Sequence, residues 1–385
     1  MLHRGTAICL AAGLLTALAL AQVEERKVVY IYVSNHPANS SENQIHAFKA
    51  HADGRLVAIP GSPFNFDETS LSASGNQLFA VNRAAPLISS FAIRPNGALE
   101  FQQATNYARP NPNGCGIAGW LFSDRTGAGL YAMDFRGDCA NNIYQSFATN
   151  GPNGKLAFLG SVNGGAGSFA GVYLPATFLS NNLYAYEATN NGCMYFAVHG
   201  FRRQPDGLLA QANISITLPT PPPGFRTYSP TFAAADAAGH IAITLLRANP
   251  PGCTEDERVQ IAAFTAEANG NLTTTNTYAT MHTASITNVT DLKISPGGDL
   301  IAVGGTEGLQ LFHFNGANLV TPYTGILTVD PITQMFWDRS HHLYAISQTA
   351  DRLHVFTITT TEYHEAPGSP EPIQRPQFLA VHPLQ

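Results

Sequence analysis

Short stretches in which apolar and polar residues alternate recur along most of the chain, and turns that contain Gly separate them. One such stretch occurs as LFAVN, LYAMD, LYAYE, LIAVG and LYAIS, at 78–82, 130–134, 183–187, 300–304 and 343–347. The stretch that follows it ends in turns such as ADGRL, PNGAL, PNGKL and ANGNL. A period of two is typical of β-strands, and Asn-Gly or Asp-Gly between two such strands is typical of a hairpin. The pattern predicts an all-β protein whose repeats contain four short strands each.

The repeats are expected to close into a ring. Full repeats span about 66–112, 113–167, 168–222, 223–284, 285–328 and 329–370, whereas the preceding segment 28–65 has only three strands. The end of the chain, 374–385, contains one further alternating stretch, QFLAVHP. This repeat length is typical of a β-propeller, and a terminal strand that completes an incomplete blade removes unpaired edges. We predict a seven-bladed β-propeller whose first blade combines 28–65 with 374–385.

The first 21 residues have the pattern of a secretory signal peptide. His3 and Arg4 precede an apolar run, Ala7–Ala21, which ends in a small-x-small triplet before the polar sequence QVEERK. The run is short for a membrane span, although a signal anchor is the alternative. We expect residues 1–21 to be removed and residues 22–385 to form the mature propeller. The protein is then secreted or periplasmic, with no transmembrane span after signal removal.

Removal of the signal leaves four cysteines, Cys115, Cys139, Cys193 and Cys253. An even number in an exported protein favours two disulfides, and four buried thiols are the alternative. The pairs Cys115–Cys139 and Cys193–Cys253 fit the expected loops, but the sequence alone leaves three connectivities. None of these cysteines has the Cys-x-x-Cys spacing of a zinc site, so no metal is expected.

Charge and composition restrict the partners. The formal net charge is −6, and no run of Lys and Arg is longer than two residues, which argues against nucleic acid. The Gly-rich segment 160–171 does not match a phosphate-binding loop, and no cofactor is expected. We expect a monomer that binds a small polar ligand or a component of the cell envelope.

Several motifs resemble those of a known family of propellers. They are YVSN at 32–35, GSPF at 61–64, ISPGGDLIAV at 294–303 and the PNGxL and PDGxL turns. On these motifs the whole mature chain resembles the seven-bladed lactonase-like family, which includes 6-phosphogluconolactonase and the fungal carboxymuconate cyclases. YVSN also resembles the YVTN-type repeats of surface-layer propellers.

The resemblance implies a catalytic set made of a His near the start of one inner strand, an Arg-His pair at the start of another, and a Glu after the next strand. In this chain the third repeat opens NGCGIAGWLFSD without a His. The Arg-His pair falls on Thr231 and Phe232, and the Glu position falls near Arg247. These residues cannot move a proton as His and Glu do. We therefore expect the acid–base residues of the family to be replaced.

Charged residues at or just after second strands form the candidate ligand site. In a propeller the loops after second strands and the connections between blades share one face, around the mouth of the central channel. The candidates on this face are Arg83, Asp134, Glu187 and Arg247. Groups of both charges around a channel suit a polar small molecule, and a solvated rim of loops is the alternative. Trp120 and Trp337 fall in inner strands and are expected to pack in the core.

The leading hypothesis is an exported binding module whose family acid–base residues are replaced. The first alternative is a hydrolase of a lactone, such as a sugar-acid lactone, with a rebuilt site, and the second is a scaffold of the cell envelope. The sequence leaves open whether the protein is an enzyme.

Overall fold

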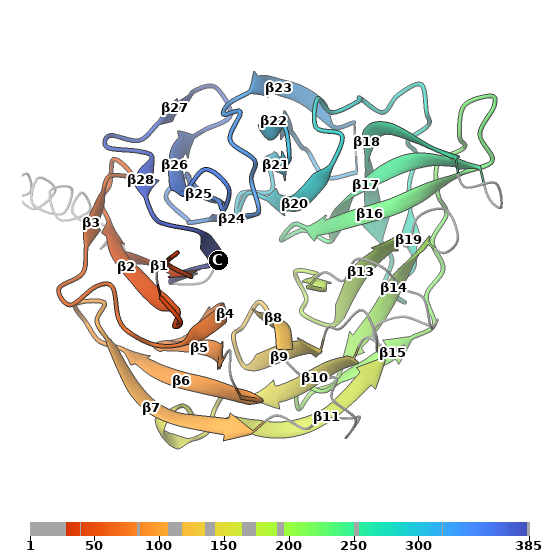
Figure 1. Ribbon diagram of the computed structural model, residues 1–385. Coiled ribbons are helices and arrows are strands. Elements are labelled where there is room, and N and C mark those ends of the chain that lie inside the picture. Colours follow the sequence, from red (N-terminus) through yellow and green to blue (C-terminus); the bar gives the residue numbers. More distant parts are fainter. Residues whose placement is uncertain are drawn as a thin grey trace, which may run out of the picture.

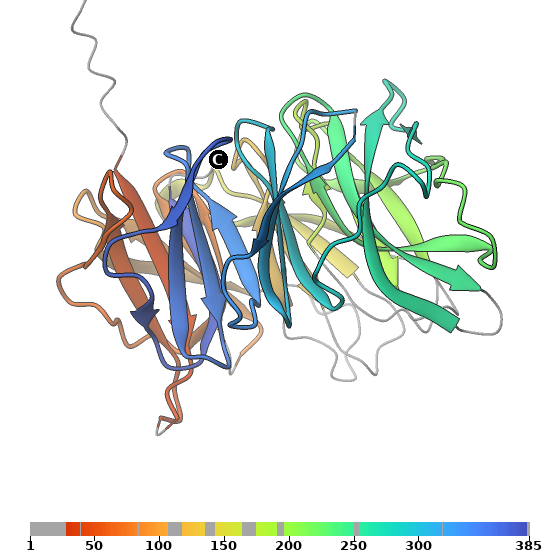
Figure 2. The same cartoon turned by 90° about the horizontal axis from the view of Figure 1, so that it is seen from above.

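The protein is a ring of seven β-sheets around a central channel (Figure 1). The computed structural model describes residues 28–38, 40–82, 85–106, 118–134, 143–163, 175–190, 196–249, 254–317 and 319–382. Each sheet is one blade, and its strands are called A to D from the channel outward. Figure 2 shows the blades edge-on, with strands running between the two faces of the ring. The predicted seven-bladed β-propeller is confirmed.

The blades have the following strands. Blades 1 and 2 contain β29 (Pro376–His382), β1 (Val29–Asn35), β2 (Gln44–Ala50) and β3 (Leu56–Ala58), then β4 (Glu68–Ser74), β5 (Gln77–Asn82), β6 (Leu87–Ile93) and β7 (Leu99–Asn106). Blades 3 and 4 contain β8 (Ala118–Ser123), β9 (Gly129–Asp134), β10 (Ile143–Ala148) and β11 (Ala157–Asn163), then β12 (Thr177–Phe178), β13 (Tyr184–Asn190), β14 (Phe196–Arg203) and β15 (Leu209–Ala212). A short 3-10 helix, η1 (Pro152–Gly154), lies between β10 and β11.

The remaining blades follow the same order. Blades 5 and 6 contain β16 (Thr227–Ala235), β17 (His240–Asn249), β18 (Thr254–Ala266) and β19 (Leu272–Thr273), then β20 (Val289–Ile294), β21 (Leu300–Gly305), β22 (Gly308–His313) and β23 (Thr321–Ile326). Blade 7 contains β24 (Gln334–Trp337), β25 (His342–Ser347), β26 (Arg352–Ile358), β27 (Tyr363–Glu365) and β28 (Glu371–Pro372), which pairs with β26. No helix in the described ranges is long and apolar enough to cross a membrane.

The two ends of the described chain meet in blade 1. Strand β29 pairs antiparallel with β1, with Ile31 opposite Val381 and Val33 opposite Leu379. These side chains are buried against Tyr344 of blade 7. Burial of an aliphatic side chain stabilises a fold by about 1.5–3 kcal/mol. The closing strand therefore stabilises both blade 1 and the contact between blades 1 and 7. The predicted completion of the first blade by the C-terminal strand is confirmed.

The recurrent Tyr of the B strands and the recurrent Gly of the C–D turns are partners across blades. The hydroxyl of Tyr32 donates to the carbonyl of Gly97 in the next blade at 2.8 Å. Tyr131 donates in the same way to Gly207 at 2.8 Å, and Tyr186 donates to Gly270 at 2.7 Å. Gly97 has a φ of +83°, and a Cβ there would lie 2.6 Å from the ring of Tyr30. Only Gly suits that combination of backbone and close contact, which explains why both motifs recur together.

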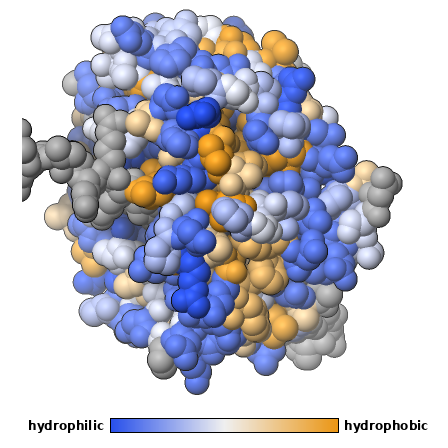
Figure 3. Space-filling view, turned by 90° about the vertical axis from the view of Figure 1, so that its left-hand side faces the viewer, coloured by the Kyte–Doolittle hydropathy of each residue, from blue (hydrophilic) through white to orange (hydrophobic). Residues whose placement is uncertain are grey.

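The outer D strands leave some large apolar side chains exposed. Figure 3 shows apolar surface in a stripe between hydrophilic regions on the side of the ring where blades 1 and 7 lie. Outer-strand aromatics are nevertheless packed on one face: Phe101 lies edge-on to Phe91 at 5.7 Å, and Tyr363 lies edge-on to Tyr323 at 5.5 Å. The first pair joins strands C and D of blade 2, and the second joins the D strands of blades 6 and 7.

Candidate functional site

The inner strands enclose a cavity of about 700 Å³ in the central channel. Its lining comes from the inner strand of every blade, including the closing strand β29. The inner strands of blades 2 to 7 begin at the face that holds the connections between blades and end at their A–B turns. The lining includes Arg125, Ala237, Gly297 and Arg339 in four of these turns, so the cavity reaches the face formed by the A–B turns.

The wall of the cavity is largely apolar. Trp120 and Phe336 are half-buried in the lining, and so are Ala233 and Ala235 of β16. Trp120 lies edge-on to Phe378 at 5.0 Å. Trp337 is 1% exposed and packs in the core as predicted. Trp120 is half-buried against the core cluster of blades 3 and 4 and also lines the cavity, so the core prediction for Trp120 is confirmed in part. Side chains near the axis of a propeller have no neighbouring blade to cover them.

The hydroxyl groups of the lining are already engaged in hydrogen bonds. Ser72 and Ser123 bond each other at 2.8 Å, and Thr177 accepts the N–H of Ala235 at 3.0 Å. Thr290 donates to the carbonyl of Ile332. These bonds join neighbouring inner strands, so the hydroxyls serve the ring and leave the middle of the cavity with mainly apolar surface.

Lys293 brings a positive charge to the wall of the cavity. Its Nζ lies 2.6 Å from Oδ1 of Asp291 and 5.4 Å from the centre of the Phe336 ring. Asp291 also accepts the N–H groups of Leu292 at 2.9 Å and Met335 at 2.7 Å. The carboxylate is therefore well supplied with donors, while the ammonium of Lys293 has N–H groups left for a ligand.

Arg125 links three blades at the end of the cavity. From the A–B turn of blade 3 it donates to the carbonyls of Phe178 at 2.8 Å, Ala235 at 2.7 Å and Asp236 at 2.8 Å. The inner strand of blade 4, β12, has only two residues, and Arg125 ties it to blade 5. Burial lowers the pKa of Arg125 and the charge of Asp236 opposes this. The guanidinium stays charged, and it is met by carbonyl oxygens as its hydrogen-bond acceptors.

Arg339 and His341 lie at the same end, in the A–B turn of blade 7. Both are exposed, and neither side chain has a hydrogen-bond or ion-pair partner among the residues that the structure describes. His341 has a φ of +68°, a conformation that His adopts more readily than most residues. Both side chains are therefore available to a molecule at this mouth.

The two carboxylates of the neighbouring turns are not available in the same way. Oδ2 of Asp124 pairs with Nε of Arg203 at 2.7 Å, and Oδ1 accepts the N–H of Thr126 at 2.9 Å. Oδ2 of Asp236 lies 2.7 Å from Nδ1 of His240, and its Oδ1 accepts the N–H of His240 at 2.8 Å. Both carboxylates thus stabilise their own turns.

The predicted loop-face residues lie elsewhere. Glu187 is 1% exposed in the interior of β13. Its carboxylate accepts a hydrogen bond from the phenol of Tyr144 in blade 3. Burial is the larger cause that raises the pKa of this phenol, and the charge and hydrogen bond of Glu187 raise it further. Arg247 is half-buried inside β17, 3.1 Å from Gln260 through Nε and 6.0 Å from the ring of Phe225. Both strands continue beyond these residues, so the expectation that they end their strands is wrong.

Asp134 is the last residue of β9, but its side chain lies outside the described part, as does all of Arg83. The four cysteines, Cys115, Cys139, Cys193 and Cys253, also fall outside the described residues. The loop-face site and both disulfides therefore stay predictions. Among the described residues, no group of three His, Cys, Asp or Glu side chains could hold a metal ion.

The positions that correspond to the Arg-His pair lie in β16. The hydroxyl of Thr231 bonds that of Thr244 at 2.7 Å, and Phe232 is 8% exposed in the core. Neither residue has a group that transfers protons near neutral pH. The expectation that this part of the family's set is replaced stays a prediction.

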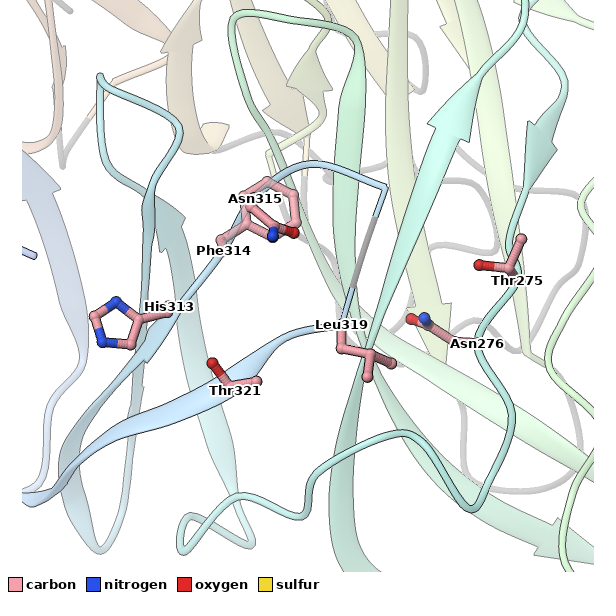
Figure 4. Close-up of a pocket in the computed structure, with 7 residues that line it drawn as sticks. All are labelled: Thr275, Asn276, His313, Phe314, Asn315, Leu319 and Thr321. Carbon is pink, nitrogen blue, oxygen red and sulfur yellow. The ribbon is translucent and has the colours of Figure 1, made fainter.

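A second hollow lies on the outer side of the ring, between the end of blade 5 and the C–D turn of blade 6 (Figure 4). It has a volume of about 410 Å³ and is lined by Thr275, Asn276, His313, Phe314, Asn315, Leu319 and Thr321. Asn276 uses its Oδ1 to accept the N–H of Ala263 at 2.7 Å. Among the described residues that line this hollow there is no Lys, Arg, Asp or Glu, and the central cavity is the better candidate site.

The residues at the channel mouth have a signal in the sequence. Arg125 and Arg339 each follow the Asp of an A–B turn, in SDRTG and WDRSH. The same dipeptide at the same place in two repeats points to one end of the channel. The sequence interpretation considered the other face, where the B–C loops lie, and did not select these residues.

Comparison with solved structures supports the fold. The periplasmic gluconolactonase PpgL of Pseudomonas aeruginosa matches 92% of this chain over 99% of its own length, with a TM-score of 0.63 and 14% identity. A Bacteroides fragilis protein provisionally assigned as a 6-phosphogluconolactonase matches 92% of this chain and 98% of its own, with a TM-score of 0.62 and 14% identity. A Lactobacillus plantarum protein matches 92% of this chain and 99% of its own, with a TM-score of 0.63 and 12% identity. The chain has the fold of the seven-bladed lactonase-like propellers.

No protein-family model matches the chain, and no curated protein sequence matches it. Since the structural neighbours are this distant in sequence, their similarity shows the fold, and the chemistry of the site has to be argued from the residues of this chain.

Proposed function

We propose that the protein binds a small organic molecule in its central channel. The observation that carries the proposal is the cavity of about 700 Å³, with apolar walls and a few charged groups at one end. Sites for small molecules are typically concave, of this size and mostly apolar, with few polar groups that orient the ligand. The residues at the family's Arg-His position, Thr231 and Phe232, favour binding without turnover.

Titration calorimetry on the mature chain, residues 22–385, tests the proposal. The panel contains 1-naphthoate, 1-naphthamide, gluconate and glucono-δ-lactone. We expect saturable binding of at least one compound. Replacement of Ala233, whose methyl group lines the cavity, by Trp fills the channel and should abolish this binding. Val329, which is 81% exposed and absent from the lining, provides the control variant Val329→Trp.

Binding that survives in Ala233→Trp, from a variant whose circular dichroism and melting temperature match the wild type, would contradict the proposal. So would the same loss in Val329→Trp, because that substitution leaves the channel open.

Hydrolysis of a lactone is the alternative. It is supported by the printed names of two structural neighbours, a gluconolactonase and a provisional 6-phosphogluconolactonase. The matching experiment is a pH-stat assay of glucono-δ-lactone with the wild type and with Arg247→Ala. Saturable turnover above the spontaneous rate, lost in the variant, would replace binding by catalysis as the function and place the site on the loop face.

We also propose export, on the pattern of residues 1–21, with a monomeric mature chain; attachment to the cell envelope is the scaffold alternative. N-terminal sequencing of the protein from cells that express the full chain should give Gln22 as the first residue. Recovery of a chain that still begins at Met1 would contradict removal of the signal.

A further inference from the structure

We infer that the channel takes an aromatic carboxylate, with the carboxylate at the end formed by the A–B turns and the ring among the inner strands. The inference rests on the proposed function and adds the chemical class and the orientation of the ligand.

Hydrogen-bonding capacity at the channel end selects an anion. Arg339 and His341 have no described partner there, and the Lys293 ammonium has one described partner, Asp291. Each of the carboxylates Asp124, Asp236 and Asp291 already accepts at least three hydrogen bonds. A molecule at this mouth therefore meets available donors and occupied acceptors. A carboxylate accepts from such donors without adding a donor of its own.

The charge of Arg125 strengthens the same preference. Its Nε and Nη2 donate to three backbone carbonyls, and Nη1 has no acceptor among the residues that the structure describes. Since these acceptors are neutral, its positive charge is not cancelled by direct pairing with a carboxylate. Lys293 lies in the inner strand β20 of blade 6 and Arg125 in the A–B turn of blade 3, so two blades each bring a positive charge to the lining of the same cavity.

The part of the ligand that enters the channel can be inferred from the side chains that line the cavity. Trp120 and Phe336 present half-buried aromatic surface, and the small side chains of Ala233 and Ala235 leave room in the cavity. A sugar acid would bring several hydroxyl groups into this region. The lining hydroxyls of Ser72, Ser123 and Thr290 are engaged with other partners, so those ligand hydroxyls would lose their bonds to water. A flat apolar ring has no such cost and gains contact with aromatic side chains.

Calorimetry with three compounds tests the class. 1-Naphthoate has both the ring and the anion, 1-naphthamide keeps the ring without charge, and gluconate keeps the anion on a polyol. We expect 1-naphthoate to bind the wild type at least about tenfold more tightly than either of the others, as charge-assisted hydrogen bonds are lost with the amide.

Substitutions of the donors test the orientation. Lys293→Gln should weaken the affinity for 1-naphthoate by about ten- to a hundredfold and leave the affinity for 1-naphthamide unchanged. Arg339→Gln and His341→Asn, at exposed positions, should weaken it by about two- to fivefold each. Arg94→Gln is the control. It removes an exposed Arg that pairs with Glu100 on the outside of blade 2, and it should leave the affinity for 1-naphthoate unchanged.

Two results would overturn the inference while leaving the proposed function intact. One is 1-naphthamide or gluconate binding as tightly as 1-naphthoate, with the binding lost in Ala233→Trp. The other is unchanged affinity for 1-naphthoate in folded Lys293→Gln. Binding of 1-naphthoate that persists in Ala233→Trp would overturn both, because the ligand would then lie outside the channel.

Discussion

The contact between blades 1 and 2 and the A–B turn of blade 7 each bury a carboxyl group almost completely, and the two groups respond in opposite ways. Glu68 is 4% exposed and Asp338 is 1% exposed. The pKa of Glu68 is raised to about 7, whereas the pKa of Asp338 is lowered from its ordinary value. Burial is nearly the same at the two sites, so burial by itself does not explain the difference.

The partners of each carboxyl explain it. Burial raises the pKa of Glu68, hydrogen bonds from Ser89, at 2.6 Å, and Asn82 oppose the rise, and the charge of Asp67 adds to it. These partners are neutral or negative, and they compensate the lost water only in part.

At Asp338 burial would also raise the pKa, but the hydrogen bond and charge of His342 outweigh it. Oδ2 accepts from Nδ1 of His342 at 2.8 Å and from the hydroxyl of Tyr344 at 2.9 Å. Oδ1 accepts the N–H groups of Ser340 at 2.6 Å and His342 at 2.9 Å. Four donors, one of them a His, hold the carboxylate in its charged form. The comparison teaches that the donors around a buried acid decide its charge.

The largest expected effect comes from Asp338→Ala. The substitution leaves two backbone N–H groups and the buried His342 without their acceptor, which should cost about 3–5 kcal/mol of unfolding free energy. Urea unfolding at pH 7, followed by tryptophan fluorescence, measures it. A loss below about 1 kcal/mol would show that the blade turn does not depend on this carboxylate.

The next largest effect is a gain in stability from Glu68→Gln at alkaline pH. Because the folded pKa of about 7 lies above the ordinary value of 4.5, the carboxyl contributes stability below pH 4.5 that is lost as the pH rises through 7. Gln resembles the protonated form and does not titrate. The variant should match the wild type near pH 4 and exceed it by about 3 kcal/mol at pH 8.

Urea titrations of both proteins at pH 4, 6 and 8 check this difference. Arg94→Gln removes one exposed charge on the outside of blade 2, and as the control it should keep the wild-type slope of unfolding free energy with pH. If the unfolding free energies of Glu68→Gln and the wild type differ by the same amount at all three pH values, the pKa of Glu68 is not raised in the fold and the carboxyl is charged there.

The smallest effect is expected for Asp236→Ala in blade 5. This residue repeats the turn of Asp338: its Oδ1 accepts the N–H groups of Ala238 and His240, and its Oδ2 pairs with the His240 ring. The His240 side chain is 24% exposed, compared with 1% for His342. Water can replace part of the lost bonds, so we expect a loss of about 1–2 kcal/mol. A loss as large as that of Asp338→Ala would mean that exposure does not matter at these turns.

The fold could be predicted from the sequence to a large extent because its signals are local. Alternation within a strand and an Asn-Gly or Asp-Gly turn between strands are properties of neighbouring residues. The missing strand at one end and the additional strand at the other, Pro376–His382, made closure of the ring predictable.

The candidate site was less predictable. Counting from the motif LYAYE places Glu187 at the end of its strand, yet β13 continues to Asn190 and the residue lies between blades. The channel residues Lys293 and Arg339 belong to different repeats, and no local pattern says that their side chains share a cavity with Trp120. Position in a repeat predicted the face of a residue better than its burial.

The sequence by itself determined the number of blades, the pairing of the last strand with the first and the recurrence of Tyr and Gly. Only the tertiary structure decided that Tyr131 meets Gly207 of the next blade, that Arg125 reaches Ala235 over 110 residues, and that Glu68 lacks a cation beside Ser89. The physical reason is range: backbone conformation and turns depend on adjacent residues, whereas charge state and ligand recognition depend on groups that only the closed ring brings together.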